Sequence, residues 1–355
     1  MGERPTRPGR RALCAAGWRA GCAAALGVTP AWVAAQAVGA AAAAGPVLVP
    51  SPGTVRAPGA GQTGPVIARQ SADLPARARR IVSLDDLSTE ILMSLGVAPL
   101  AAANLDSYRR YVDLHADLLK DSQPLGSPQQ PDLEALVRLQ PDLIVGVSYL
   151  HLPLFDRLQR IAPTLLFQVS LAPGSLDGVD IGAAMLATLG NMTGRQDIAR
   201  RMLASSARAV SQTRAAIASK GLAGTPVVPF YPLSREGTFI VSNDQSMIAA
   251  LMNRLDVANP WRLASGHALH RRIGVREIAG RNDLTALFVG GQEGAPLFKT
   301  PLWQALPVAR AGRYAFLPSP YWTFGGPTSV ERLAGQVADA VRAMSAAKPS
   351  MQVPG

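Results

Sequence analysis

Short apolar runs alternate with helix-length amphipathic segments between residues 79 and 345. Residues 80–84 suit a buried strand, and residues 87–95, which follow Asp86 and Ser88 and end before Gly96, suit a helix. The same order recurs along the chain. The pattern predicts further strands at 143–147, 165–167, 227–228, 239–241, 284–289 and 314–317, and further helices at 131–139, 155–161, 247–255, 303–310 and 329–344. Such alternation predicts an α/β fold with parallel sheets.

Residues 178–220 differ, because their apolar positions keep a helical period for much longer. Met185, Leu189 and Met192 share one face, and the 38 residues from 182 to 219 would span more than about 50 Å as one helix. Gly194 could divide this segment. A helix of that length suits a bridge, so we expect two α/β lobes, 79–177 and 221–345, that are joined by a long rigid helix and followed by a tail at 346–355. Ligands of open α/β sheets bind beyond the carboxyl ends of the strands, which places the ligand cleft between the lobes.

The N-terminal region has the composition of a targeting segment. Arg10 and Arg11 precede an Ala-rich apolar stretch, and residues 35–37 form a small-x-small cleavage site. We therefore predict a signal peptide at 1–37, of the twin-arginine kind, with export to the periplasm; an uncleaved apolar anchor is the alternative. Residues 38–78, rich in Ala, Gly and Pro, are predicted to be a flexible tether. Both cysteines, Cys14 and Cys22, lie in the leader, so the exported chain would have no disulfide, and lipidation at Cys22 stays open.

Charge and motifs exclude several functions. The formal net charge is +11, of which residues 1–37 carry +4, and no Lys/Arg run is interleaved with aromatic residues, so we expect no nucleic-acid partner. The four histidines have no acidic or cysteine partners at metal-ligand spacing, which predicts no metal site. The chain has no nucleophile turn, phosphate loop or carboxylate pair, so we predict no enzyme. An exported enzyme that uses the cleft remains the alternative of another class.

Several segments together resemble the ferric-hydroxamate siderophore-binding proteins of periplasmic ABC importers. These segments are 80–84, 90–97, 131–134, 141–145, 160–163 and, most specifically, 300–307 with 311–314. The resemblance implies a monomer that binds a ferric siderophore and delivers it to an inner-membrane ABC permease. It implies no cofactor, because the chelator holds the iron. A binder of another iron chelate, haem or a corrinoid is the alternative.

The resemblance and the strand ends select the candidate ligand residues together. Aromatic rings suit the apolar parts of a chelate and a few donors suit its oxygens. Trp303, inside a predicted helix, is interpreted as core. The family pattern has an arginine at about Pro128 and a tryptophan near Ala268, and this chain has neither; Arg109 or Arg110, and His267 or His270, could replace them. The candidates are Tyr108, Arg109, Tyr111, His267, Trp322 and Phe324, with Tyr149 and His151 as alternatives for one position.

One acidic residue on each lobe is expected to dock on the permease, again by resemblance. Asp156, at the start of a predicted helix, matches the first position, and Glu277 is the candidate for the second. For each of them, a favourable charge at a helix start is the alternative interpretation.

Overall fold

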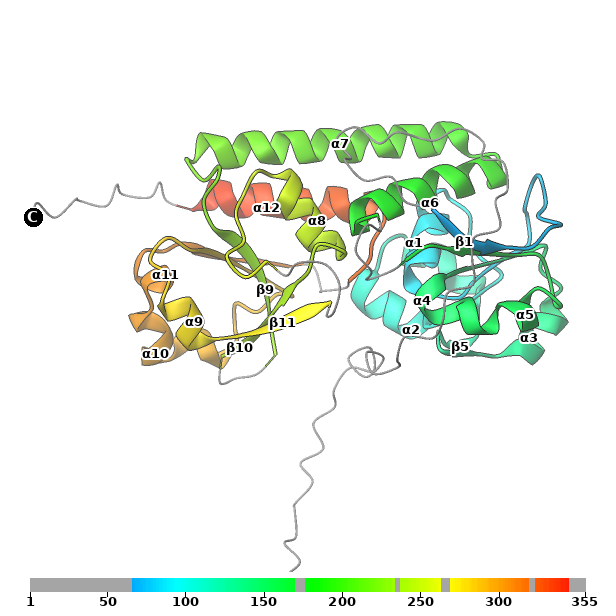
Figure 1. Ribbon diagram of the computed structural model, residues 1–355, viewed down its shortest axis with the longest axis horizontal. Coiled ribbons are helices and arrows are strands. Elements are labelled where there is room, and N and C mark those ends of the chain that lie inside the picture. Colours follow the sequence, from blue (N-terminus) through cyan, green and yellow to red (C-terminus); the bar gives the residue numbers. More distant parts are fainter. Residues whose placement is uncertain (1–65, 170–175, 234–236, 263–268, 319–322, 345–355) are drawn as a thin grey trace, which may run out of the picture. The chain divides into compact units, whose positions relative to one another are not determined.

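Two β-sheets organise the described part of the chain, and each has helices packed against it (Figure 1). The computed structural model describes residues 66–169, 176–233, 237–262, 269–318 and 323–344, all of which belong to one compact unit. The α/β class predicted from the sequence is confirmed by this arrangement.

The N-terminal sheet has the strand order β1-β8-β7-β2-β3-β4, and every neighbouring pair is parallel except β1 with β8. Its strands are β1 (Ile67–Gln70), β2 (Ile81–Ser83), β3 (Ala101–Ala102), β4 (Gln123–Pro124), β7 (Leu143–Val147) and β8 (Thr164–Phe167); β5 (Gly126–Ser127) and β6 (Gln130–Pro131) form a separate ribbon. The helical elements are α1 (Asp86–Ser94), α2 (Leu105–Ser107), η2 (Tyr108–Val112), η3 (Ala116–Asp121), α3 (Leu133–Leu139), α4 (Ser148–His151), η4 (Leu152–Leu154) and α5 (Phe155–Leu158). Side-chain caps start two of these helices: Asp85 accepts from the Ser88 amide, and Asp132 from the Ala135 amide.

The predicted tether, residues 38–78, is too long at its C-terminal end, because it includes β1. β1 pairs antiparallel with β8, and buried Ser71 exchanges backbone and side-chain hydrogen bonds with Thr164. The N-terminal lobe therefore begins by residue 67 rather than 79. The hydrophobic pattern of β1 could not be recognised in the sequence, because the strand has only four residues. As an edge strand, β1 is stabilised by its pairing with β8, which the sequence does not reveal.

The C-terminal sheet has the order β11-β10-β9-β12-β13. Its strands are β9 (Val227–Pro232), β10 (Thr238–Ser242), β11 (His270–Gly274), β12 (Thr285–Val289) and β13 (Tyr314–Leu317), and its helices are α8 (Met247–Arg254), α9 (Val275–Ala279), η5 (Pro296–Lys299), α10 (Pro301–Ala305), α11 (Pro307–Arg310) and α12 (Pro327–Ala343). Only β9, β12 and β13 are parallel, whereas β10 is antiparallel to both β9 and β11. The expectation of a parallel sheet is thus corrected here, because the connection from β9 to β10 is too short for a crossover helix.

Aromatic rings fill the core of this lobe. Phe288 of β12 contacts the rings of Phe230, Phe298 and Trp303 at centroid distances of 5.8, 4.7 and 5.3 Å. Trp303 is fully buried, which confirms its interpretation as core. The helix predicted at 303–310 is instead two helices, because Leu306 is extended before Pro307.

Two helices, rather than one, occupy residues 178–219. α6 (Gly178–Thr193) ends at Gly194, whose φ of +68° closes the helix, and α7 (Gln196–Ser219) begins after it. The connecting helix is therefore divided at Gly194, as the sequence allowed, and α7 is its longer part. α7 packs on α6 and along α12 (Figure 1). Among the described residues, no helix is long and apolar enough to span a membrane.

Candidate functional site

Polar residues follow three neighbouring parallel strands of the N-terminal sheet. Asp86 comes shortly after β2, Asn104 after β3, and Tyr149 after β7. The Asn104 side-chain amide donates to Asp86 Oδ2 at 2.8 Å. These residues therefore share the carboxyl edge of the sheet, where ligands of α/β proteins bind.

Asp86 has an unusual environment for a carboxylate. Its Oδ1 atom is buried and has no hydrogen-bond partner among the described residues. Burial raises the pKa of Asp86 to about 7, against the Asn104 hydrogen bond that lowers it, and the nearby acids Asp85 and Glu90 raise it further. The Asp86 carboxyl group at this edge therefore changes from neutral to anionic near neutral pH. The sequence interpretation considered Asp86 only as a helix-start residue.

Tyr149 contacts an aromatic residue from the other lobe. Its side chain is exposed, and its ring centroid lies 5.7 Å from that of Phe324, which precedes α12. Phe324 also packs on the apolar cluster of the N-terminal lobe. Two predicted ligand residues, separated by about half of the sequence, are thus brought together.

One further tyrosine from each lobe has its electrostatic environment affected by the other lobe. Tyr111 of η2 is exposed, and Tyr231 lies near the carboxyl end of β9. Burial, and after it the electrostatic influence of Tyr111, raises the pKa of Tyr231. Tyr231 was missed from the sequence, although its position at a strand's carboxyl end was a usable signal. We call Asp86, Asn104, Tyr111, Tyr149, Tyr231 and Phe324 the interlobe site.

Two predicted ligand residues are buried structural residues instead. Tyr108 is completely buried, and its hydroxyl donates to the Leu114 carbonyl at 2.8 Å. His151 is equally buried: its Nδ1 accepts from the Val147 amide, and its Nε2 donates to the Pro128 carbonyl, both at 3.0 Å. Burial lowers the pKa of His151, which favours the neutral ring. Between the alternatives Tyr149 and His151, only Tyr149 reaches the surface.

Arg109 is held by its own loop. Its guanidinium donates to the Leu119 carbonyl at 3.0 Å and lies 3.7 Å from Asp106. Because both contacts are local, Arg109 is not directed at the interlobe site as a free cation. His267 and Trp322 lie outside the described residues. His270, the possible substitute, lies on strand β11 with its Nδ1 3.2 Å from Ser242 Oγ.

The two docking candidates are exposed acids with neighbours. Asp156, in the first turn of α5, accepts from Arg69 at 3.0 Å, and the Arg69 guanidinium lies over the Phe155 ring at 4.4 Å. Glu277 accepts from the Gly274 amide at 2.8 Å and lies 3.4 Å from Arg271. Glu277 thus caps α9, as its alternative interpretation held, and its docking role stays a prediction.

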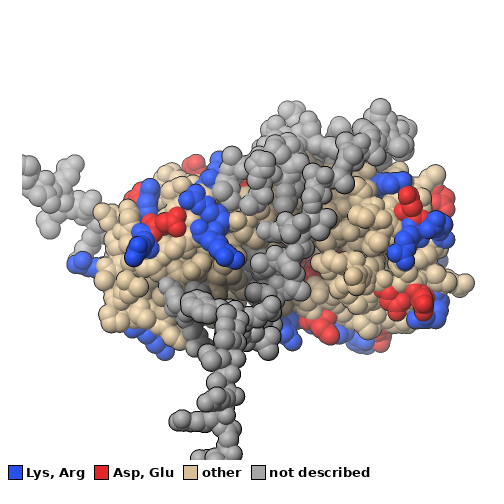
Figure 2. Space-filling view, turned by 60° about the horizontal axis from the view of Figure 1, so that its bottom comes forward, with Lys and Arg blue, Asp and Glu red and all other residues tan. Residues whose placement is uncertain are grey.

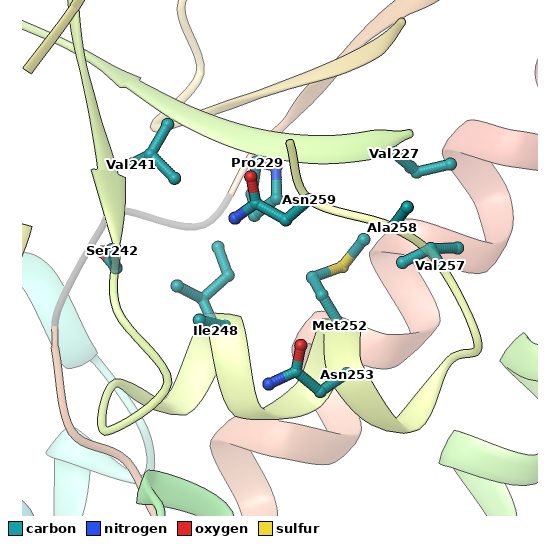
Figure 3. Close-up of a pocket in the computed structure, with 11 residues that line it drawn as sticks. Val227, Pro229, Val241, Ser242, Ile248, Met252, Asn253, Val257, Ala258 and Asn259 are labelled. Atoms are coloured by element: carbon teal, nitrogen blue, oxygen red, sulfur yellow. The ribbon is translucent and has the colours of Figure 1, made fainter. Parts of the chain in front are cut away.

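A small pocket of the C-terminal lobe lies apart from these residues. Figure 3 shows it between α8 and the strands β9 and β10, lined mainly by apolar side chains that include Val227, Ile248 and Met252. None of the interlobe-site residues lines it. On the face shown in Figure 2, acidic and basic residues lie in small mixed groups where the described surface is visible. No group of three His, Cys, Asp or Glu within the described ranges could hold a metal ion.

Two α/β lobes, joined by helices and with an aromatic contact between them at the carboxyl edge of the N-terminal sheet, define a two-lobed binding protein. The chain belongs to the periplasmic binding protein family, whose model matches residues 81–321. The chain is 27% identical over 258 residues to the iron(3+)-hydroxamate-binding protein FhuD of Escherichia coli, covering 70% of this chain and 82% of FhuD. It is also 27% identical over 260 residues to the Fe(3+) dicitrate-binding periplasmic protein FecB of E. coli, covering 72% of this chain and 82% of FecB.

Solved structures share the fold. The siderophore-binding protein FhuD from Vibrio cholerae, in its complex with Fe3+-Desferal, superposes with a TM-score of 0.65 at 22% identity and covers 75% of this chain and 98% of its own. The predicted relationship to siderophore-binding proteins is thereby confirmed. The family consists of solute-binding proteins rather than enzymes.

Proposed function

We propose that this protein binds a ferric siderophore of the hydroxamate type outside the cytoplasm and delivers it to an ABC-type permease. The observation that carries the proposal is the contact between the rings of Tyr149 and Phe324, which come from the two lobes and meet at the carboxyl edge of the N-terminal sheet. Rings at this edge suit the organic shell of a chelate that already satisfies its iron. The relatives named above bind iron chelates, which supports the class of ligand.

The charges near the interlobe site favour an uncharged chelate. Three hydroxamate anions neutralise ferric iron, whereas ferric citrate and tris-catecholate complexes keep negative charge. The Asp86 carboxyl group is negatively charged above about pH 7. The Arg109 guanidinium already donates to the Leu119 carbonyl and pairs with Asp106. Residues 263–268 and 319–322, which hold the predicted ligands His267 and Trp322, include no charged residue. Apart from Arg110 of η2, an anionic chelate would therefore find little near these residues to balance its charge.

Delivery and location follow from the same proposal. FecB is named as a periplasmic protein, and the basic, Ala-rich residues 1–37 have the composition of an export signal. Asp156 and Glu277 are the proposed contacts with the permease, and both carboxylates are exposed enough to pair with arginines of a partner.

A ligand panel tests the proposal. Quenching of tryptophan fluorescence would be followed with ferrioxamine, ferrichrome, ferric citrate, a ferric catecholate, haem and cobalamin. We expect ferrioxamine or ferrichrome to bind with a Kd of about 1 μM or below, and the anionic chelates at least about tenfold more weakly. Tighter binding of citrate or a catecholate would overturn the hydroxamate assignment, and binding of haem or cobalamin alone would overturn the siderophore class.

Two variants connect the panel to the site. Tyr149→Ala removes the ring that contacts Phe324 and should weaken hydroxamate binding about tenfold, since a stacked ring contributes on the order of 1 kcal/mol beyond its buried area. Tyr149→Phe keeps the ring and is the matched control, with affinity expected within about twofold. Equal affinity of Tyr149→Ala and the unmodified protein would show that the ligand lies elsewhere.

A further inference from the structure

Glu90 is a completely buried acid that the interlobe site does not include. It lies on α1 of the N-terminal lobe, and its Oε1 accepts hydrogen bonds from the backbone amides of Gly326 and Ser329 at 3.0 and 3.1 Å. These amides belong to the N-cap position and the third residue of α12. One carboxylate oxygen therefore connects two segments more than 230 residues apart in sequence.

α12 cannot supply this cap itself. Its N-cap residue is Gly326, which has no side chain, and Pro327 follows at the first helical position. The first amides of a helix need acceptors, and a negative charge near them is favourable because of the helix dipole. Glu90 performs across the lobes the task that a Ser, Thr or Asp usually performs within a helix.

Close packing keeps the start of α12 against the N-terminal lobe. A Cβ atom on Gly326 would lie 2.5 Å from Ile91 Cδ1 and 3.2 Å from Glu90 Oε1, so no larger residue fits without displacement. Ser94 Oγ lies 2.8 Å from Thr328 Oγ1, one turn of α1 further on. Arg332 of α12 donates to the Val112 carbonyl of the N-terminal lobe at 3.1 Å. The first two turns of α12 thus dock on α1 and η2.

Phe324 stands two residues before this cap. Its contact with Tyr149 depends on where residues 324–326 lie, because only Gly325 separates Phe324 from the cap and Gly325 itself packs on α6, where a Cβ atom on Gly182 would lie 2.6 Å from its carbonyl oxygen. The titratable groups that face Glu90 are the acid Asp86 of α1, the cation Arg332 of α12 and the neutral Tyr108 phenol. Burial raises the pKa of Glu90 to about 6, against Ser329, Gly326 and Arg332, which lower it, so the cap is anionic at pH 7.5.

We propose that Glu90 is a positioning residue for ligand binding, which holds the start of α12 on the N-terminal lobe and thereby places Phe324 against Tyr149. This inference rests on the proposed function for its ligand but not for its geometry. Glu90 would thereby contribute to the affinity for the chelate without contacting it.

The first test needs no ligand. Hydrogen exchange of the segment 323–333, followed by mass spectrometry in the full chain at pH 7.5, should be about tenfold or more faster in Glu90→Ala, since two capping bonds lose their acceptor. Glu90→Gln keeps an acceptor oxygen in the same place and should exchange nearly as the unmodified protein does. Glu134→Ala removes an exposed acid of α3 and is the matched control. Unchanged exchange in Glu90→Ala would overturn the inference.

The second test measures ferrioxamine affinity at a temperature where circular dichroism shows every variant folded. Glu90→Ala and Gly326→Ala should each bind about tenfold more weakly, and Glu90→Gln within about twofold. In a double-mutant cycle, the losses from Glu90→Ala and Phe324→Ala should not add, because one residue acts through the other. Additive losses, or wild-type affinity in folded Glu90→Ala, would refute a positioning role.

The two tests separate the two proposals. Faster exchange in Glu90→Ala, together with no binding of any chelate by the unmodified protein, would uphold the cap and reject the siderophore function. Normal chelate binding with unchanged exchange would do the reverse.

Discussion

Buried acids at the start of α1 distinguish this protein at the scale of single residues. Asp85, Asp86 and Glu90 lie within two turns, and burial raises the pKa of all three. Asp85 and Glu90 cap helices, whereas Asp86 has an unpartnered Oδ1. Ionising Asp86 therefore costs free energy, because no described residue donates a hydrogen bond to its buried Oδ1 atom.

Asp86→Asn should therefore stabilise the protein at high pH. The pKa of Asp86 is about 7 in the folded state and about 3.9 when unfolded. Because the folded pKa is the higher one, stability from this group is complete below about pH 4 and is lost as the pH rises through 7. We expect Asp86→Asn to raise the free energy of unfolding by about 2–4 kcal/mol at pH 8 and by much less at pH 4.5. Urea denaturation at both pH values would measure this.

An equal loss of stability at both pH values would instead show that the Asn104 hydrogen bond, and not the buried charge, dominates at this position. Asp106→Asn, which changes an exposed acid in the same lobe, serves as the control and should alter stability by less than about 0.5 kcal/mol at either pH.

A buried ion pair connects elements at the next scale. Arg254, near the end of α8, pairs with Asp177 and Asp180 at the start of α6, both at 2.7 Å, and all three side chains are mostly buried. Asp177 also accepts from the amides of Val179 and Asp180 as the cap of α6. The guanidinium therefore ties the connecting helices to the C-terminal lobe.

Arg254→Met should destabilise the fold, because it leaves two carboxylates partly buried without a cation. We expect the free energy of unfolding to fall by about 1–3 kcal/mol, less than for a fully buried pair because solvent screens part of the interaction. Guanidinium denaturation would measure the change. Arg200→Met breaks an exposed pair with Asp197 and should cost less than about 1 kcal/mol. A loss no larger than this control would mean that the Arg254 pairs contribute nothing specific.

At the scale of the whole molecule, the sheet of the N-terminal lobe includes a strand ahead of the predicted boundary. β1 covers the outer edge of β8, and Ser71 is buried beside Thr164. Residues 66–78 therefore belong to the folded lobe. The position of the boundary decides how much of the N-terminal region the protein can lose.

Three truncated chains, which begin at residues 45, 66 and 79, test that boundary. A chain that begins at residue 66 should unfold within about 2 °C of one that begins at residue 45, since it keeps β1. A chain that begins at residue 79 should lose at least about 4 °C in Tm, because the edge of β8 and the Thr164 amide lose their partners. Calorimetry would measure both transitions, and equal Tm values for all three chains would show that β1 adds no stability.

The sequence by itself determined the α/β class, most strands and helices, and the core position of Trp303, because periodicity reports which side chains can be buried together. It also placed Tyr149 and Phe324 after the carboxyl ends of predicted strands. Only the tertiary structure decided that Tyr108 and His151 are buried while Tyr149 is exposed, since the step of two residues from Tyr149 to His151 in a short helix turns their rings to opposite sides. The cap of α12 by Glu90 had no sequence signal, because its donor and acceptor come together only when both lobes are folded.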